Sequence, residues 1–121
     1  GQMADEERDV IVAQFRPLDL EVKRLSIAWQ DAEAADDWDA RMTVIEALST
    51  LQDKTEAFVS AQAERLPRWL EFGDRLGAAL ARILEGETDY IVGVRLPSYH
   101  TIWFEFHEDL LRTLERRRDA E

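Results

Sequence analysis

An apolar side chain recurs every three or four residues through the first quarter of the chain, as expected for one helix face packed against neighbours. The series continues through Pro17 without a shift of phase. It therefore predicts one long helix with a kink, or two helices stacked end to end, over about residues 5–35. Its members are Ile11, Phe15, Leu18, Val22, Leu25, Trp29 and Ala32.

The same spacing returns in two later stretches. The first, over about residues 38–65, follows a group of acidic residues in which Asp36 or Asp37 is suited to cap the helix. Leu66-Pro67 is expected to end or kink that helix, because the residue before a proline avoids helical geometry, and Pro67 is suited to begin a third helix over about residues 67–85. The expected core positions are Val44, Leu48, Leu51, Thr55 and Phe58 in the second helix, and Trp69, Phe72, Leu76, Leu80 and Ile83 in the third.

Two glycines lie inside the third helix and a third glycine follows it. Gly73 and Gly77 lie inside it, where each costs about 1 kcal/mol relative to alanine, so we expect another helix to approach closely there. Gly86 is suited to end the helix, because glycine accepts the left-handed conformation of a C-terminal cap.

A last helix is predicted over about residues 98–118. Its apolar surface is wider than one helix contact requires, because Phe104 and Leu111 lie outside the main stripe. The helix is therefore central in the bundle or covers a second subunit. Residues 86–97 before it form a connector, which we expect to be ordered or to hold a short extra helix, since an isolated strand is not stable. The main stripe comprises Tyr99, Ile102, Trp103, Phe106, Leu110 and Leu114.

These segments predict an all-α protein, an antiparallel (up-and-down) four-helix bundle with a kinked first helix, forming a single domain over residues 1–121. Residues 1–4 are expected to be disordered or derived from an expression vector. A first helix of about 30 residues would be about 45 Å long at 1.5 Å per residue, which is long for one compact chain of this size. That length and the four tryptophans favour a homodimer.

The formal net charge of −11 narrows the range of partners. An acidic chain repels phosphate backbones and anionic membranes, so we expect no nucleic acid and no membrane, whereas a basic protein would be attracted. The chain has no cysteine, no apolar run long enough to cross a bilayer, and 13 arginines against 2 lysines. These features favour a bacterial, cytoplasmic protein. Four arginines near one another on the helical wheel are expected to form a solvated border: Arg65, Arg68, Arg75 and Arg82.

One short element is a candidate for catalysis. Arg95 is followed after four residues by His100, just where the last helix begins. This spacing resembles the Arg-x4–6-His element of HEPN-family RNases, which are all-α and often dimeric. The resemblance implies metal-independent RNA cleavage, in which the imidazole would move the 2′-hydroxyl proton and the guanidinium would stabilise phosphate charge. Pro97 lies between the two residues and disfavours a helical conformation at Leu96.

Two features of the sequence bear on metal binding. His100 and His107 are seven residues apart on one helix face, but neither completes the Glu-x-x-His unit of a di-iron bundle. Carboxylate pairs three residues apart resemble those with which all-α nucleotide pyrophosphohydrolases of the MazG and dimeric dUTPase group hold Mg²⁺. The pairs are Glu33 with Asp36, Asp36 with Asp39, and Glu105 with Glu108.

We expect a protein–protein interaction module that acts as an adaptor, an assembly factor or an inhibitor of another protein. No phosphate-binding glycine loop or cysteine–histidine metal motif is present, so we expect no cofactor and no metal. The enzymatic alternatives are the RNase with Arg95 and His100, and the Mg²⁺-dependent pyrophosphohydrolase. Aromatic side chains dominate the energetics of protein interfaces, and the expected anchors are Trp103, Phe104, Phe106, Trp69 and Trp38.

Overall fold

The computed structural model describes residues 5–120, with side chains placed through residue 115, so the expectation for residues 1–4 lies outside the described residues. All regular structure in the described range is helical, and the prediction of an all-α helical bundle is confirmed. No helix in this range combines the length and apolar character that a bilayer crossing requires. The helices are α1 (Asp5–Ala34), α2 (Trp38–Ala61), α3 (Trp69–Leu84), α4 (Asp89–Val92) and α5 (Tyr99–Ala120).

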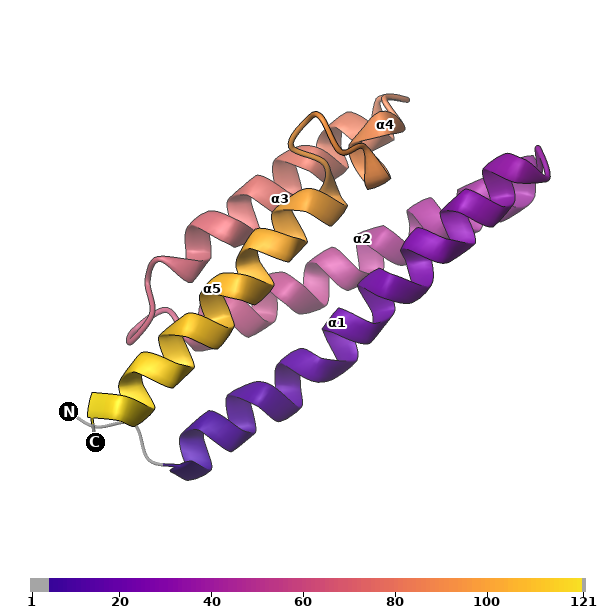
Figure 1. The fold of residues 1–121 in the computed structure, drawn as a ribbon. Coiled ribbons are helices and arrows are strands. Elements are labelled where there is room, and N and C mark those ends of the chain that lie inside the picture. The colour runs from indigo at the N-terminus through magenta and orange to yellow at the C-terminus, as the bar shows by residue number, and fades with distance from the viewer. Residues whose placement is uncertain (1–4, 121) are drawn as a thin grey trace.

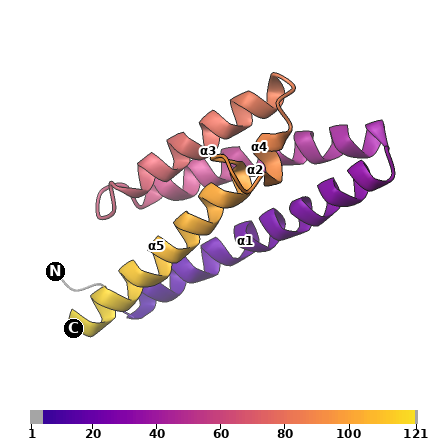
Figure 2. The same ribbon diagram turned by 45° about the horizontal axis from the view of Figure 1, so that its top comes forward.

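The four long helices form a ring in which α1 contacts α2, α2 contacts α3, α3 contacts α5, and α5 contacts α1. Each runs back along the one before it, so the start of α1 and the end of α5 lie at the same end of the molecule (Figure 1). At the other end, the hairpin of α1 and α2 extends past the remaining helices, as both views show (Figure 2). The short α4 packs against α1, α3 and α5 near that end.

Helix α1 is continuous through Pro17, so the alternative of two stacked helices is wrong. Proline removes one backbone donor and frees a carbonyl one turn earlier. Pro17 is exposed, and the residue that carries the freed carbonyl, Ala13, is exposed as well, so water can hydrate that group. All seven residues of the predicted stripe are buried, which confirms the helix face read from the sequence.

The turn between α1 and α2 is built from two consecutive aspartates. Asp36 has a left-handed backbone with φ of 50°, and the N–H of Asp37 donates to the carbonyl of Ala32 at 2.9 Å. This geometry is a Schellman cap. Asp37 then caps α2, because its side chain accepts from the N–H of Ala40 at 3.1 Å. Of the two residues proposed as the cap of the second helix, Asp37 has that role.

The end of α3 follows the sequence prediction. Gly86 has φ of 98°, and the N–H of Glu87 donates to the carbonyl of Arg82 at 3.0 Å, which is again a Schellman cap. The close approach expected at the internal glycines is also present. A Cβ on Gly73 would lie 3.1 Å from Val59 Cγ2 of α2, and one on Gly77 would lie 3.4 Å from Gln52 Nε2 of α2.

Helix boundaries near Pro67 differ from those predicted. Helix α2 ends at Ala61 instead of 65, and α3 begins at Trp69 instead of 67. Residues 62–68 form successive turns, in which the N–H of Leu66 donates to the carbonyl of Gln62 at 2.8 Å. Since proline disfavours helical geometry at the residue before it, the chain reverses over several residues, and Leu66 is buried beneath the turn.

The connector 86–97 contains the one-turn helix α4, the second of the two conformations expected there. Its Ile91 is buried in the core. Helix α5 then begins at a buried serine: Ser98 Oγ accepts from the N–H of Thr101 at 3.3 Å and donates to the carbonyl of Gly93 at 2.6 Å. This pair of bonds ties the connector to the start of the last helix.

Candidate functional site

An apolar pocket of about 540 Å³ lies where the α1–α2 hairpin extends past the end of α3. Trp38 at the start of α2 is 65% exposed, and Leu84 at the end of α3 is 61% exposed. Trp29 and Ile83 contribute buried apolar surface to the same lining. We call this feature the Trp38 pocket; it is completed by Glu33, Arg41, Met42, Ile45, Gly86 and Thr88.

The surroundings of the Trp38 pocket are acidic. The two segments that supply most of its lining, residues 33–42 and 83–89, contain seven carboxylates and one arginine. That arginine, Arg41, forms an ion pair with Asp36 at 3.1 Å, while its Nε is buried and has no hydrogen-bond partner among the described residues. The pocket therefore combines apolar walls with a negative rim.

A second exposed apolar surface lies on α5. Phe104 is 61% exposed and Leu111 is 48% exposed, seven residues apart on one helix face. Between them His107 stacks on Phe15 of α1, with ring centroids 5.5 Å apart. Val12 of α1, three residues before Phe15, is also exposed. We call these four side chains, Phe104, His107, Leu111 and Val12, the Phe104 face.

The other three predicted anchors lie in the core of the single chain. Trp69 and Phe106 have no exposed surface, and Trp103 is 3% exposed. The ring of Phe106 meets rings from the three other long helices, so these residues hold the bundle together and are not available to a partner. Its ring neighbours are Phe15, Phe58, Trp69, Phe72 and Trp103.

Two carboxylates accept hydrogen bonds from the indole N–H groups of two of the three buried tryptophans. Trp69 Nε1 donates to Asp109 at 2.9 Å, and Trp103 Nε1 donates to Asp19 at 3.0 Å. Neither aspartate was predicted from the sequence. An acidic residue next to an apolar stripe could have indicated them, since a buried indole N–H needs an acceptor.

The carboxyl group of Asp19 has a shifted pKa. Partial burial by itself raises the pKa of this carboxyl, but the hydrogen bonds from Trp103 and Lys23 and the charges of His107 and Lys23 bring it below its usual value. Lys23 Nζ lies 3.0 Å from Asp19 Oδ2. The carboxylate is therefore held ionised between α1 and α5.

Two consecutive buried hydrogen bonds connect three helices. Tyr99 donates its hydroxyl hydrogen to Gln52 Oε1 at 2.7 Å, and Gln52 Nε2 donates to the carbonyl of Gly73 at 3.1 Å. Burial raises the pKa of Tyr99 well above its ordinary value, so the hydroxyl stays protonated. Sequence reasoning missed Gln52, whose polar side chain next to the predicted stripe was the only signal.

The candidate RNase residues lie just before α5 and in its first turn. Arg95 is in the turn before Pro97 and His100 is in the first turn of the helix, and both are exposed. Within the described part of the chain, neither side chain makes a hydrogen bond or an ion pair with the other or with a third residue. Pro97 keeps Arg95 outside the helix that carries His100.

Two of the carboxylates proposed for Mg²⁺ pair with arginines. Glu105 accepts from Arg75 at 2.7 Å, and Asp36 pairs with Arg41. Across residues 5–115, no three histidine or carboxylate side chains gather closely enough to hold a metal ion. The histidines are also separated in role, since His107 stacks on Phe15 while His100 is exposed.

Each arginine of the predicted border reaches a carboxylate. Arg68 lies 3.0 Å from Asp109, and Arg82 lies 3.3 Å from Glu87. The border is thus a row of ion pairs along α3 and its neighbours. The other two pairs join Arg75 to Glu105 and Arg65 to Glu7.

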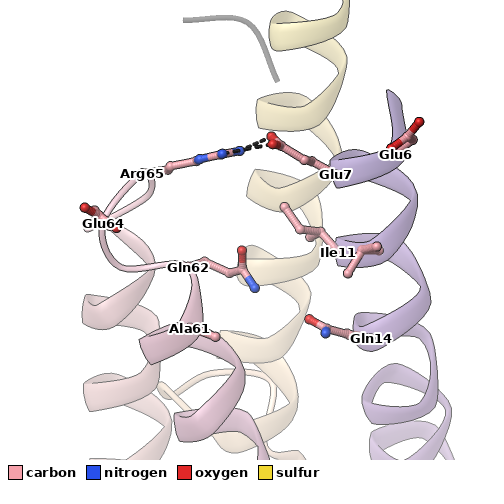
Figure 3. Close-up of a pocket in the computed structure, with 9 residues that line it drawn as sticks. Glu6, Glu7, Ile11, Gln14, Ala61, Gln62, Glu64 and Arg65 are labelled. Atoms are coloured by element: carbon pink, nitrogen blue, oxygen red, sulfur yellow. Dashed lines mark hydrogen bonds and ion pairs between the residues drawn. The ribbon is translucent and has the colours of Figure 1, made fainter. Parts of the chain in front are cut away.

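A polar groove of about 530 Å³ lies at the opposite end of the bundle from the Trp38 pocket, between the start of α1 and the turn after α2. Arg65 reaches across it to both carboxylate oxygens of Glu7, one at 3.0 Å (Figure 3). Gln14, Gln62 and Ile11 line it below this pair, and the lining contains no histidine or hydroxyl side chain. The ion pair links the start of α1 to the turn after α2.

The structure thus separates the predicted anchors into two exposed residues, Trp38 and Phe104, at different places on the molecule, and three in the core. Among the described residues it shows no contact between Arg95 and His100 and no group of three histidine or carboxylate side chains. Comparisons with protein-family models, with curated proteins and with solved structures found no match for this chain.

Proposed function

We propose that this chain is a protein-interaction module, an adaptor, assembly factor or inhibitor of another protein, and that it forms a homodimer. The observation that carries the proposal is the exposure of Phe104 and Trp38 on a bundle whose core is already filled by other aromatic side chains. Large apolar side chains gathered at the surface mark binding sites more often than isolated ones do.

The Phe104 face is the surface we propose for the homodimer. Phe104, Leu111 and Val12 are exposed in the single chain and belong to two adjacent helices. Their burial against a second copy would remove apolar area from water, which favours association at about 25 cal/mol per Å² before the entropic cost of binding. The wide apolar surface of the last helix is then explained by two contacts, one with its own bundle and one with the partner.

Sedimentation velocity over a range of concentrations tests the dimer. We expect the wild type to sediment with twice the mass of the chain, and the Phe104→Gln, Leu111→Gln double variant to raise the dissociation constant about tenfold or more, as for loss of an interface hot spot. Val94→Gln is the matched control, because Val94 is 81% exposed on a different part of the surface. A wild type that is monomeric at every concentration contradicts the homodimer.

Incubation with single-stranded RNA tests the enzymatic alternative. The proposed function predicts no cleavage that depends on Arg95 or His100, since the structure describes no contact between them. Cleavage by the wild type that is lost in both Arg95→Ala and His100→Ala would contradict the proposal and favour the RNase.

A further inference from the structure

We infer that the Trp38 pocket receives a basic amphipathic helix of a partner protein, with a large apolar side chain entering the pocket and Lys or Arg side chains over its rim. The inference rests on the proposed function and names the chemistry of the partner. It uses a different surface from the one proposed for the homodimer, so the two can fail separately.

The shape of the molecule provides the apolar part of the site. Because the α1–α2 hairpin extends past α3, the apolar faces at its end have no third long helix to cover them (Figure 1). Met42 and Ile45 are only partly buried, and Trp38 and Leu84 are mostly exposed. The volume of about 540 Å³ is within the range of about 300–1,000 Å³ found for pockets that bind ligands. A helix that inserts one apolar anchor into such a site follows a recurrent mode of peptide recognition.

The charge around the pocket selects the partner. Glu33 lines it, Asp39 and Glu85 lie in the two segments that border it, and none of the three forms an ion pair among the described residues. Helices α1 and α3 both end here, and the C-terminal end of a helix carries partial negative charge. The positive start of α2 is capped by Asp37. A cationic segment is therefore attracted, and an acidic or phosphate-bearing one is repelled.

Trp38 is suited to both parts of this recognition. Its indole is broad enough to contact an apolar anchor, and its exposed face can stack under a Lys or Arg side chain as a cation–π contact. Phe104 also exposes an aromatic ring, but its neighbours on α5 include both carboxylates and histidines, and it does not line the pocket. Trp38 is thus distinguished from Phe104 by the pocket that it lines.

The test uses a fluorescein-labelled synthetic Leu–Lys peptide with helical amphipathic spacing, titrated with the full chain and followed by fluorescence polarisation. We expect Trp38→Ala to weaken binding about tenfold or more, and Leu84→Gln, a second variant at an exposed site, to weaken it in the same direction. Leu20→Ala is the control, because Leu20 is 59% exposed and lines neither the Trp38 pocket nor the Phe104 face, and it should retain the wild-type affinity. A Leu–Glu peptide with the same apolar spacing should not bind.

The charge requirement has its own pair of variants. Glu33→Gln with Glu85→Gln should weaken binding of the Leu–Lys peptide several-fold and reduce its dependence on salt, since two rim charges are removed. Asp53→Asn with Glu71→Gln removes two exposed carboxylates elsewhere and should leave the affinity unchanged.

Four outcomes would overturn the inference. Equal binding of the peptide to the wild type and to Trp38→Ala would place its docking site elsewhere while leaving an interaction module intact. Absence of binding, in a chain that still dimerises through the Phe104 face, would refute the pocket alone. Loss of the dimer in Trp38→Ala in the absence of peptide would show that a second copy covers the pocket. A wild-type protein that is monomeric and binds no peptide would refute the proposed function as well.

Discussion

At the scale of single residues, the Gln52 amide joins α2 to two other helices, because it accepts from the Tyr99 hydroxyl of α5 and donates to the Gly73 carbonyl of α3. A buried acceptor that loses its donor costs about 1–3 kcal/mol, which is more than the hydrogen bond contributes in net terms. Since burial raises the pKa of Tyr99, its hydroxyl remains a donor at neutral and mildly alkaline pH. The two hydrogen bonds of Gln52 therefore fix the relative positions of three helices.

Tyr99→Phe removes the donor and leaves Gln52 Oε1 without it. We expect the free energy of unfolding to fall by about 1–3 kcal/mol, measured by urea denaturation. Tyr90→Phe is the control, since Tyr90 is only partly buried and its ring contacts Arg82; it should change stability by less than about 0.5 kcal/mol. Equal losses in the two variants would show that the Gln52 bond contributes nothing specific.

Asp19 gives the stability of the protein a dependence on pH. Its pKa is lowered in the folded state from the ordinary value of 3.8, so the folded protein binds this proton less tightly than the unfolded chain does. The stabilisation is therefore complete above the ordinary pKa and is lost as the pH falls through the lower pKa of the folded state.

Asp19→Asn should keep an acceptor for Trp103 but remove the charge. We expect it to be less stable than the wild type near pH 7, and the difference to shrink as the pH falls below about 4. Urea unfolding at a series of pH values measures the difference directly. Asp53→Asn, on the exposed side of α2, should follow the wild-type curve throughout. A difference that stays constant with pH would exclude a role for the ionised Asp19.

At the scale of elements, the α1–α2 turn has an aspartate where glycine is most common. Asp36 has φ of 50°, a conformation that costs a residue with a Cβ about 1 kcal/mol or more relative to glycine. Its carboxylate pairs with Arg41, but an exposed pair of this kind contributes only about 0–1 kcal/mol. The turn therefore retains some backbone strain.

Asp36→Gly and Asp36→Ala both remove the ion pair, and only the glycine variant relieves the strain. We expect the glycine variant to be more stable than the alanine variant by about 1 kcal/mol, measured by thermal and urea unfolding. Identical stabilities would mean that the turn relaxes out of the left-handed conformation when Asp36 is replaced.

Some of the helices, caps and turns could be predicted from the spacing of apolar residues and local capping rules, and others could not. The buried stripe of α1 and the cap at Asp37 follow from local rules, so both were predicted from the sequence. The turn at residues 62–68 was not predicted from the sequence, because its length depends on the packing of Leu66 beneath it as well as on Pro67. Helical periodicity also placed Trp69 and Phe106 on apolar faces correctly, but it does not say whether a face meets the same chain or another.

At the scale of the whole molecule, the aromatic rings around Phe106 come from all four long helices. A change at their centre should therefore affect the whole bundle and not one helix. The two exposed anchors could not be separated from the three buried ones by sequence, because Phe104 and Phe106 differ by two positions on one helix with a wide apolar surface. Exposure depends on how far the neighbouring helices extend, which is a property of the assembled fold.

Phe106→Ala should lower the free energy of unfolding by about 3–5 kcal/mol, the usual cost of emptying a buried aromatic site. Circular dichroism and tryptophan fluorescence should report the same single transition, because the four helices share this centre. Phe104→Ala is the same change on the exposed side of α5 and should cost less than about 0.5 kcal/mol in dilute solution. Separate transitions for the two probes would show that the hairpin of α1 and α2 unfolds independently.

The distribution of indoles has a spectroscopic consequence. Trp29, Trp69 and Trp103 are at most 3% exposed, while Trp38 is 65% exposed. Excitation at the red edge of the absorption band should therefore select the solvated Trp38, and caesium should quench its emission more efficiently than iodide does, since anions are repelled by the surrounding carboxylates. The protein thus contains a natural optical reporter at the mouth of its own pocket, and no label is needed to follow what arrives there.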